Sequence, residues 1–417
     1  MKLNQLLAER IKNAIYSSIF KEMARKRPED FTRDRKMPFE ELIIFMITSL
    51  KCSTASALRR FFVNLGMSIY ISQQSVSEAR AKVKVEAFVH LYEVSAATMT
   101  EYSSKNWHGY RVYGIDGSKI ALPTDKKLLK HFGALGKDKT APTAQASILY
   151  DVLNDIIADA AIVPMTTDER TLAKKHLIAC EKLTPDVKKL IIFDRGYASF
   201  ELIEMLESMG FQYVFRVKRT FNKDVDSQAK PDGYVWLKQG EKRIHVRVIK
   251  FMLDSGEQEL LVTNITDRRL GKNAFKKLYF MRWPVEIKYD IVKNKLQLEN
   301  FNTRTVEGIQ QDFFATMLLS NFVAAAAIDV QKDIENERKD KGNKYQYKAN
   351  LNEVVGILKD RLVYALIQDS PDEQAAIIDS IQEEIKHYVT PVKPNRSVVR
   401  NKSPRQCKFQ HNQKANC

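Results

Sequence analysis

The chain has 417 residues, of which 44% are hydrophobic and 10% aromatic, and this composition excludes a disordered polypeptide. It carries 67 lysine and arginine residues against 51 aspartate and glutamate residues, for a formal net charge of +16. Such an excess favours a polyanionic partner, most simply nucleic acid, and the alternative is a basic protein with no such partner. The length exceeds one ordinary hydrophobic core, so we expect two or three domains.

The sequence gives no sign of export or membrane insertion. Met1–Glu9 leads into a polar, charged helix instead of a signal peptide. The longest uncharged run, Phe313–Ile328, has 16 residues, whereas a transmembrane helix needs about 20. We therefore expect a buried helix at this position and a cytoplasmic protein with no membrane partner.

Residues 1–105 have the spacing of helices. Apolar residues recur with helical periodicity over Phe39–Leu50, Ala57–Leu65 and Ser75–Tyr92. Within Ser75–Lys84, the cations at 80, 82 and 84 either lie along DNA or form a solvated face, and the sequence leaves both interpretations open. We interpret the whole region as helical and DNA-binding.

From Tyr110 onward, short apolar runs replace the helical pattern and predict an α/β domain with a mixed five-stranded sheet. The expected strands are Tyr110–Leu122, Ala144–Leu153, Asp155–Pro164, Lys189–Phe193 and Gln212–Lys218, and the expected helices are Thr167–Cys180 and Ser199–Met209. A turn at Asn154–Asp155 makes the second and third strands a hairpin.

In residues 220–270, apolar and polar residues alternate as they do in β-strands, and we interpret this segment as a β-rich insertion that interrupts the domain. Its expected strands are Gly233–Leu237, Lys242–Met252 and Glu257–Asn264. Helices follow at Val306–Glu335 and Asn352–His387, joined by a charged linker over Asn336–Lys348. Residues 388–417 hold seven lysines and arginines and no acidic residue, so we expect a tail that is disordered when free and suited to phosphate contact.

Two carboxylates stand at the ends of expected strands. Asp116 follows the first strand's Tyr113–Ile115, and Asp194 follows the apolar run that ends at Phe193. The desolvation of such a carboxylate needs compensation. A capping role, in the next turn for Asp116 and in the next helix for Asp194, is the structural alternative. If the first and fourth strands are adjacent, Glu286 would complete three hard oxygen ligands, the kind that Mg²⁺ prefers.

The stretch from Leu278 to Asn302 carries a tyrosine, an arginine, a glutamate and a lysine at offsets 0, 3, 7 and 14. On an ideal helix these offsets fall within roughly 60° of arc, so one face would carry all four polar groups. The alternatives are a solvated face and a site for an anionic ligand or a metal–phosphate group. Pro284 is tolerated only in a first turn, so the tyrosine and arginine lie either on a preceding turn or across a kink.

These blocks together resemble the DDE transposases of bacterial insertion sequences, in the subgroup with a Tyr-x2-Arg-x3-Glu-x6-Lys signature. Tyr279, Arg282, Glu286 and Lys293 match that signature without a gap. The blocks Gly114–Ser118 and Phe193–Tyr197 are similar to the two catalytic aspartate blocks of the family, and segments near residues 31 and 77 are similar to its amino-terminal region.

The resemblance implies an α/β fold with a ribonuclease-H-like (retroviral-integrase-like) catalytic core that the β-rich insertion interrupts. Helical N-terminal and C-terminal regions flank this core. We accordingly divide the chain into six segments. The DNA-binding region spans residues 1–105, the first part of the core 106–219 and the insertion 220–270. The second part of the core, with Glu286, spans 271–335, the helical region 336–387 and the basic tail 388–417.

The resemblance also implies a catalytic and metal-binding triad of Asp116, Asp194 and Glu286. It would hold two Mg²⁺ ions, with Mn²⁺ as a substitute, and two such ions clamp the attacking and leaving oxygens in phosphoryl transfer. No nucleotide cofactor is expected, because Gly133–Thr140 lacks the spacing and the hydroxyl of a phosphate-binding loop.

The DNA contacts near the cut are expected from the remaining signature residues, Tyr279, Arg282 and Lys293, and from Arg195. Relatives that cut through a DNA hairpin hold a flipped base against tryptophan. Trp236 is our first candidate for that role, against the alternative of a core tryptophan, and Trp283 is the second.

We therefore predict a DNA transposase that binds the terminal inverted repeats of its insertion sequence, cuts them, and joins the freed 3′-OH either to the opposite strand as a hairpin or to target DNA. It would act as a homodimer in the synaptic complex and associate with the bacterial nucleoid. Two other classes stay open: a metal-dependent DNA nuclease without strand transfer, and a non-catalytic DNA-binding protein derived from a transposase.

Overall fold

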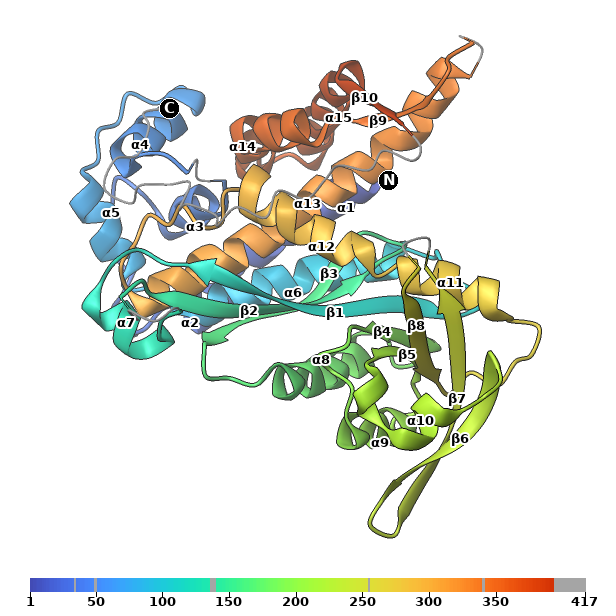
Figure 1. Ribbon diagram of the computed structural model, residues 1–417. Helices are drawn as coiled ribbons and strands as arrows, with labels where there is room; N and C mark the ends of the chain where they lie inside the picture. Colours follow the sequence, from blue (N-terminus) through green and yellow to red (C-terminus); the bar gives the residue numbers. More distant parts are fainter. Residues whose placement is uncertain (34, 49–50, 136–139, 254–255, 340–341, 394–417) are drawn as a thin grey trace. The chain divides into compact units, whose positions relative to one another are not determined.

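The computed structural model describes residues 1–33, 35–48, 51–135, 140–253, 256–339 and 342–393 (Figure 1). The chain divides into two compact units. The helical unit comprises Met1–Tyr102, Ile120–Ala144 and the chain from Ile291 onward, and the α/β unit comprises Ser103–Lys119 and Gln145–Asp290. The six segments expected from the sequence stay predictions.

A mixed eight-stranded sheet in the order β3-β2-β1-β4-β5-β8-β7-β6 is the framework of the α/β fold (Figure 1). Its strands are β1 Arg111–Ala121, β2 Thr143–Asp151, β3 Ile156–Pro164, β4 Lys189–Phe193, β5 Gln212–Val217, β6 Asp232–Gln239, β7 Lys242–Met252 and β8 Gln258–Thr263. Strands β1, β4 and β5 are parallel, whereas β8, β7 and β6 run antiparallel to their neighbours. Every strand predicted from the sequence is present.

The expected sheet of five strands is wrong in one respect, because the strands of the insertion belong to the same sheet. Strand β8 pairs with β5 from Val214↔Thr263 to Val217↔Leu260, and β7 and β6 follow outward. Without β8, the backbone groups of β5 would form an exposed edge, which proteins usually cover. Residues 219–227 also differ from the expectation, since they form the 3₁₀ helix η1 Arg219–Phe221 and helix α10 Lys223–Ser227.

The central strands are covered on both faces. Alternate side chains along a strand point to opposite faces, so each strand contributes to two cores. Tyr113, Ile191 and Phe215 belong to the core that includes helices α8 Glu169–Leu183 and α9 Phe200–Ser208. The neighbouring residues Val112, Leu190, Ile192 and Val214 pack in the core that includes helix α11 Lys272–Phe280.

In the helical unit, the long helix α13 Val306–Arg338 packs against α1, α3, α6, α14 and α15. The shorter helices are α1 Leu3–Ile15, α2 Ser18–Ala24, α3 Phe39–Thr48, α4 Thr54–Asn64, α5 Gln73–Arg80, α6 Val85–Tyr102, α7 Lys126–Phe132, α14 Leu351–Ile367 and α15 Pro371–His387. By length and composition α13 could cross a membrane, but 78% of its apolar window is buried inside the protein. The prediction of a buried helix is confirmed.

Three expectations for the helical regions need correction. The predicted helix over Ser75–Tyr92 is two helices, separated at residues 81–84. The predicted helix over Asn352–His387 is also two, because Pro371 begins α15 and cannot lie inside a longer helix. The start of the basic tail is ordered, since β10 Val389–Val392 pairs with β9 Gln346–Ala349, and residues 394–417 lie outside the described residues.

Candidate active site

The first and fourth strands of the predicted sheet are adjacent, as a cluster of the three carboxylates requires. Strands β1 and β4 pair in parallel, and the last pair in their register is Gly114↔Ile192. Asp116 and Asp194 each lie two residues beyond that pair, so both carboxylates stand at the same edge of the sheet. Asp194 directly follows β4, whereas Asp116 lies inside the longer β1.

Glu286 reaches this edge on helix α12 Trp283–Asp290. A glycine in β1 makes the close packing of that helix possible: a Cβ atom added at Gly114 would lie 2.6 Å from Cγ2 of Val285. Val285 is fully buried and precedes Glu286, so the missing side chain at Gly114 lets α12 approach β1 where the glutamate is needed. Tyr289, one turn further along α12, donates a hydrogen bond to the backbone carbonyl of Asp116 at 3.0 Å.

The signature residues do not lie on one continuous helix. Helix α11 ends at Phe280, α12 begins at Trp283, and Pro284 occupies the first turn of α12. A π-helical turn, η2 Ile291–Lys295, follows α12 directly. The break before Pro284 agrees with the expectation that the tyrosine and arginine lie on a preceding turn, and the single straight face is wrong for them.

Arg282 lies between two of the three carboxylates. Its guanidinium donates to Oε1 of Glu286 at 2.7 Å and approaches Oδ2 of Asp116 at 3.6 Å. The arginine side chain is only 8% exposed, and its Nε has no hydrogen-bond partner among the described residues. A nearly buried cation thus balances the negative charges of the acidic cluster.

Burial raises the pKa of Asp116 to about 6. The Arg282 cation and the hydrogen bond from the Gly117 N–H to Oδ1 of Asp116, at 3.0 Å, oppose this rise. The charges of Glu286 and Asp194 add to it, so both carboxylates lie within electrostatic reach of Asp116. The Gly117 bond also shows that Asp116 caps the next turn, so this capping and the site are compatible.

Asp194 is held by residues from α11 and β5. The hydroxyl of Tyr279 donates to Oδ1 of Asp194 at 3.2 Å, and Arg216 approaches the same oxygen at 3.9 Å. Burial, followed by the charge of Asp194, raises the pKa of Tyr279 to about 12, so the phenol stays a proton donor. The capping alternative for Asp194 is not observed, because Ser199 caps α9.

A buried ion cluster that the sequence did not predict lies beside Asp194. Glu259 on β8 is 2% exposed and pairs with Arg216, while Arg195 donates to it at 3.0 Å. Arg216 thereby joins Glu259 to Asp194, and its guanidinium lies 5.9 Å from the ring centre of Tyr279. In the sequence, the sign of this cluster is a charged residue in each of two apolar strands, Arg216 in β5 and Glu259 in β8. These residues are about forty positions apart, so the sequence does not indicate that they pair.

The structure places the other candidate DNA contacts as follows. Arg195 is 39% exposed at its side chain while it pairs with Glu259. Lys293 belongs to the helical unit, where it pairs with Glu299 at 3.7 Å. Trp236 on β6 is 51% exposed and packs against the His245 ring at 4.6 Å, so it is not a core tryptophan. Trp283 is 53% exposed beside Arg282.

The donor atoms of this edge suit a hard divalent cation, because they are carboxylate oxygens and a cation already lies among them. Within the described part of the chain, no three acidic, histidine or cysteine side chains converge on one ion position. The Arg282 guanidinium lies between Asp116 and Glu286, and its positive charge compensates their negative charges.

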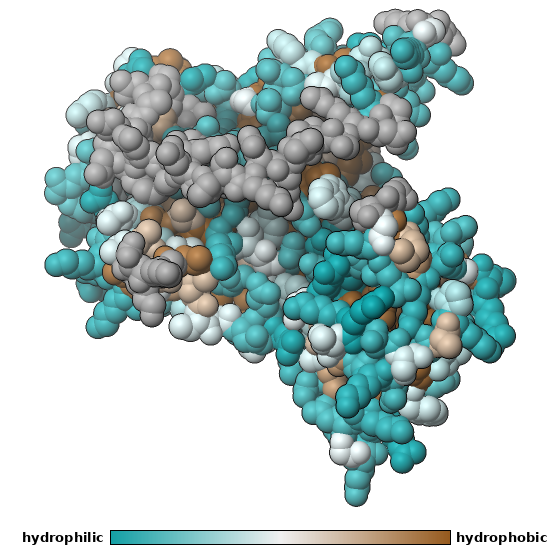
Figure 2. Space-filling model, in the orientation of Figure 1, coloured by the Kyte–Doolittle hydropathy of each residue, from teal (hydrophilic) through white to brown (hydrophobic). Residues whose placement is uncertain are grey.

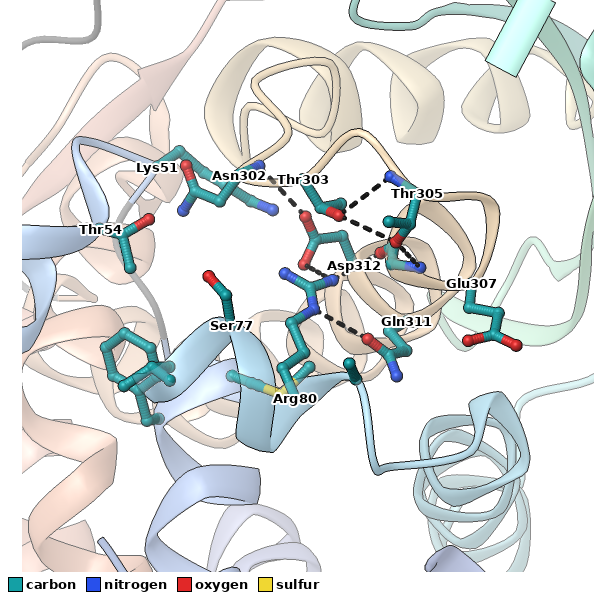
Figure 3. Close-up of a pocket in the computed structure, with 15 residues that line it drawn as sticks. Lys51, Thr54, Ser77, Arg80, Asn302, Thr303, Thr305, Glu307, Gln311 and Asp312 are labelled. Carbon is teal, nitrogen blue, oxygen red and sulfur yellow. Dashed lines mark hydrogen bonds and ion pairs between the residues drawn. The ribbon is translucent and has the colours of Figure 1, made fainter. Parts of the chain in front are cut away.

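The helical unit has a cavity of about 180 Å³, lined in part by residues of α5 and α13 (Figure 3). Arg80 points into it and donates to Gln311 at 2.8 Å, to the Gly308 carbonyl at 2.6 Å and to Asp312 at 2.9 Å. Of the three cations in Ser75–Lys84, Arg80 therefore faces inward and ties α5 to α13. Lys82 is exposed and keeps the DNA-facing interpretation open.

The comparisons with known proteins show the family of this chain. The transposase DDE domain family matches residues 107–322, which is more than half of the chain, and the chain belongs to this family. It is similar to the putative transposase InsZ of Escherichia coli (strain K12), with 23% identity over 188 residues, or 43% of this chain. That alignment spans 60% of the relative's length.

A solved structure shares the fold. It is a cryo-EM structure of the piggyBac transposase synaptic complex with hairpin DNA, with a TM-score of 0.50 and 11% sequence identity. The likeness covers 94% of this chain and 87% of that chain. At this identity it supports a common fold only.

Proposed function

We propose that the protein is a DNA transposase that cleaves the ends of its insertion sequence and transfers the freed strands in a metal-dependent reaction. The observation that carries this proposal is that Asp116 and Asp194 stand at one edge of the sheet, where the Arg282 guanidinium joins Asp116 to Glu286. The family and the relative point to the same activity.

The sheet supports a ribonuclease-H-like core. The neighbouring strands β3, β2 and β1 lead into β4 and β5, which run parallel to β1, and the candidate ligands lie on β1, after β4 and on a later helix. Two Mg²⁺ ions held there would activate water and stabilise the charge that develops on the transferred phosphate. Mn²⁺ has similar ligand preferences and would substitute.

Protein groups around the carboxylates have distinct roles in this proposal. Tyr279 and Arg216 hold Asp194, and the Tyr289 hydroxyl holds the backbone of Asp116. Arg282 would contact the DNA phosphate next to the cut, because a guanidinium binds phosphate oxygens through paired N–H groups. Arg195 would add a further phosphate contact in the α/β unit, and Lys293 would add one in the helical unit.

The exposed aromatic groups of the β6–β7 hairpin would contact DNA. The Tyr234 and His245 rings stack at 5.1 Å, and the Trp236 ring lies beside His245 with half of its surface exposed. Around them, the surface of this part of the chain is mostly hydrophilic (Figure 2). An exposed ring in such a surface suits stacking of a flipped base, as a hairpin intermediate requires.

The net charge of +16 supports double-stranded DNA, at inverted repeats and at the target, as the partner. Two DNA ends are cut and joined together, so we propose that two copies of the chain act in the synaptic complex. The exposed face of α5 and the basic residues after Tyr388 would provide further DNA contacts in the helical unit.

The test uses the purified full chain and a duplex that carries the end of the insertion sequence, with Mg²⁺, Mn²⁺ or Ca²⁺. We expect cleavage at the boundary with Mg²⁺ and Mn²⁺ and its loss in Asp116→Asn, while Asp186→Asn, at an exposed aspartate of the same unit, stays active. Joined products would separate a transposase from a nuclease. Binding without cleavage under every metal, in wild type as in the variant, would favour the non-catalytic DNA-binding protein.

A further inference from the structure

A fourth carboxylate lies against both catalytic aspartate blocks. Glu169 is the first residue of α8, and a Cβ atom added at Gly117 would lie 3.0 Å from its Oε1. One added at Gly196 would lie 3.9 Å from its Oε2. Because Gly117 follows Asp116 and Gly196 is two residues after Asp194, the Glu169 carboxylate lies between the two aspartate-bearing segments.

Local contacts fix the start of α8 in this place. Gln145 on β2 donates to Oε1 of Glu169 at 3.2 Å. The Arg170 guanidinium donates to the backbone carbonyls of Gly196, at 3.4 Å, and Ala198, at 3.3 Å, and so ties the helix to the segment after Asp194. In the described part of the chain, Glu169 is exposed and has Gln145 but no cation as a partner.

A buried hydroxyl points to a missing ligand in the same place. Tyr197 is 2% exposed, and its hydroxyl has no hydrogen-bond partner among the described residues. Burial, followed by the charges of Asp116, Glu169 and Asp194, raises the pKa of this tyrosine, so all three carboxylates lie within electrostatic reach of its side chain. A buried donor without a partner is unfavourable, and proteins usually supply one from the chain, from water or from a ligand.

We propose that Glu169 is a fourth carboxylate of the metal site and that the Tyr197 hydroxyl donates to the same cluster through a metal-bound water. The inference rests on the proposed function, because it assigns two further residues to that site. Mg²⁺ in proteins keeps several of its waters, so a site needs acceptors beyond the direct ligands. Glu169 supplies such an acceptor, and its exposure leaves it accessible to a hydrated ion.

The competing explanation is purely structural. An acidic residue in the first turn of a helix is stabilised by the helix dipole whether or not a metal is present. Glu201 also lies in the first turn of its helix, α9, in the same unit, and its carboxylate accepts a hydrogen bond from Gln239 at 3.0 Å. It is therefore a matched control for the charge and the helix position of Glu169.

The experiment measures Mn²⁺ binding to the DNA-free full chain by titration calorimetry and by the Mn²⁺-induced rise in melting temperature. We expect Glu169→Gln to weaken Mn²⁺ binding by about 10- to 100-fold, as removal of supporting groups around a metal does. Tyr197→Phe should weaken it several-fold without lowering the melting temperature in EDTA. Glu201→Gln should leave Mn²⁺ binding unchanged.

The inference is overturned if Glu169→Gln and Tyr197→Phe both bind Mn²⁺ like the wild type while Asp116→Asn does not. That outcome would leave the proposed function intact and make Glu169 a helix-stabilising residue. If the folded wild type binds no Mn²⁺ and cuts no DNA, the proposed function itself fails, and the inference fails with it.

Discussion

Replacing Asp116 by asparagine should stabilise the protein in the absence of divalent ions. Burial raises the pKa of this aspartate to about 6, against an ordinary value of 3.8, so its ionised form is disfavoured in the folded state. Asparagine has nearly the same shape and carries no charge. The variant therefore removes an unfavourable group, although it also removes one of the two anions beside Arg282.

The magnitude follows from the difference between the two pKa values. About two units at about 1.4 kcal/mol each give an upper estimate of about 3 kcal/mol, which the lost contact with Arg282 reduces. Because the folded state binds the proton more tightly, wild-type stability should fall as the pH rises from about 4 to about 6. The gain from Asp116→Asn should accordingly be absent below pH 4 and reach its full size above pH 6.

Urea unfolding in EDTA at several pH values between 3.5 and 8 measures this directly. Asp186→Asn, at an exposed aspartate of the same unit, is the control and should change the free energy of unfolding little at any pH. A variant that is less stable than the wild type at pH 8, or a difference that does not change with pH, would refute an unfavourable ionised Asp116. Below pH 6, protonation of Asp116 should also weaken Mn²⁺ binding, because metal ligands must be deprotonated.

Three further predictions concern packing, ion pairing and DNA contact. Gly114→Ala should cost about 1–3 kcal/mol in urea unfolding, because its Cβ would lie 2.6 Å from Val285, and the added change Val285→Ala should recover part of that loss. Arg247→Met should cost about 3–5 kcal/mol in the same assay, because it leaves Asp232 and three backbone carbonyls without their donor; a loss below 1 kcal/mol would contradict this. Trp236→Ala should change stability by less than about 1 kcal/mol and weaken binding of a DNA hairpin by about 5- to 100-fold in fluorescence anisotropy, with little effect on duplex.

The central strands of the sheet could be predicted from the sequence because they are strongly apolar. Lys189–Phe193 has the same bounds in the structure as in the prediction, since a strand buried on both faces leaves little doubt about its ends. The place of β6–β8 in the sheet was not accessible. Alternation of polar and apolar residues identifies a strand but not its partner, and β5 could have been an edge.

The part of the candidate site that follows from motifs and strand order was predictable from the sequence. Asp116 and Asp194 stand where parallel neighbours place them, at one edge of the sheet. The supporting residues were not predictable, because they come from positions far apart in the chain. Glu259 and Arg216 meet only through the pairing of β8 with β5, and Glu169 reads in sequence as an ordinary acidic residue at the start of a helix.

Pro284, which breaks the predicted helix, also helps to explain how the negative charge of Asp116 and Glu286 is balanced. Backbone N–H groups of Arg282 and Val285 bond to carbonyls three residues earlier, at 3.0 Å each, so the chain turns tightly just before α12. Arg282 occupies this turn, four residues before Glu286, with its guanidinium directed at Glu286 and Asp116. Two carboxylates that repel each other are thus held together by a cation from the same signature. A guanidinium that binds these anions in the free protein is also suited to binding a phosphate group, and for this reason we propose the same residue for the contact with DNA.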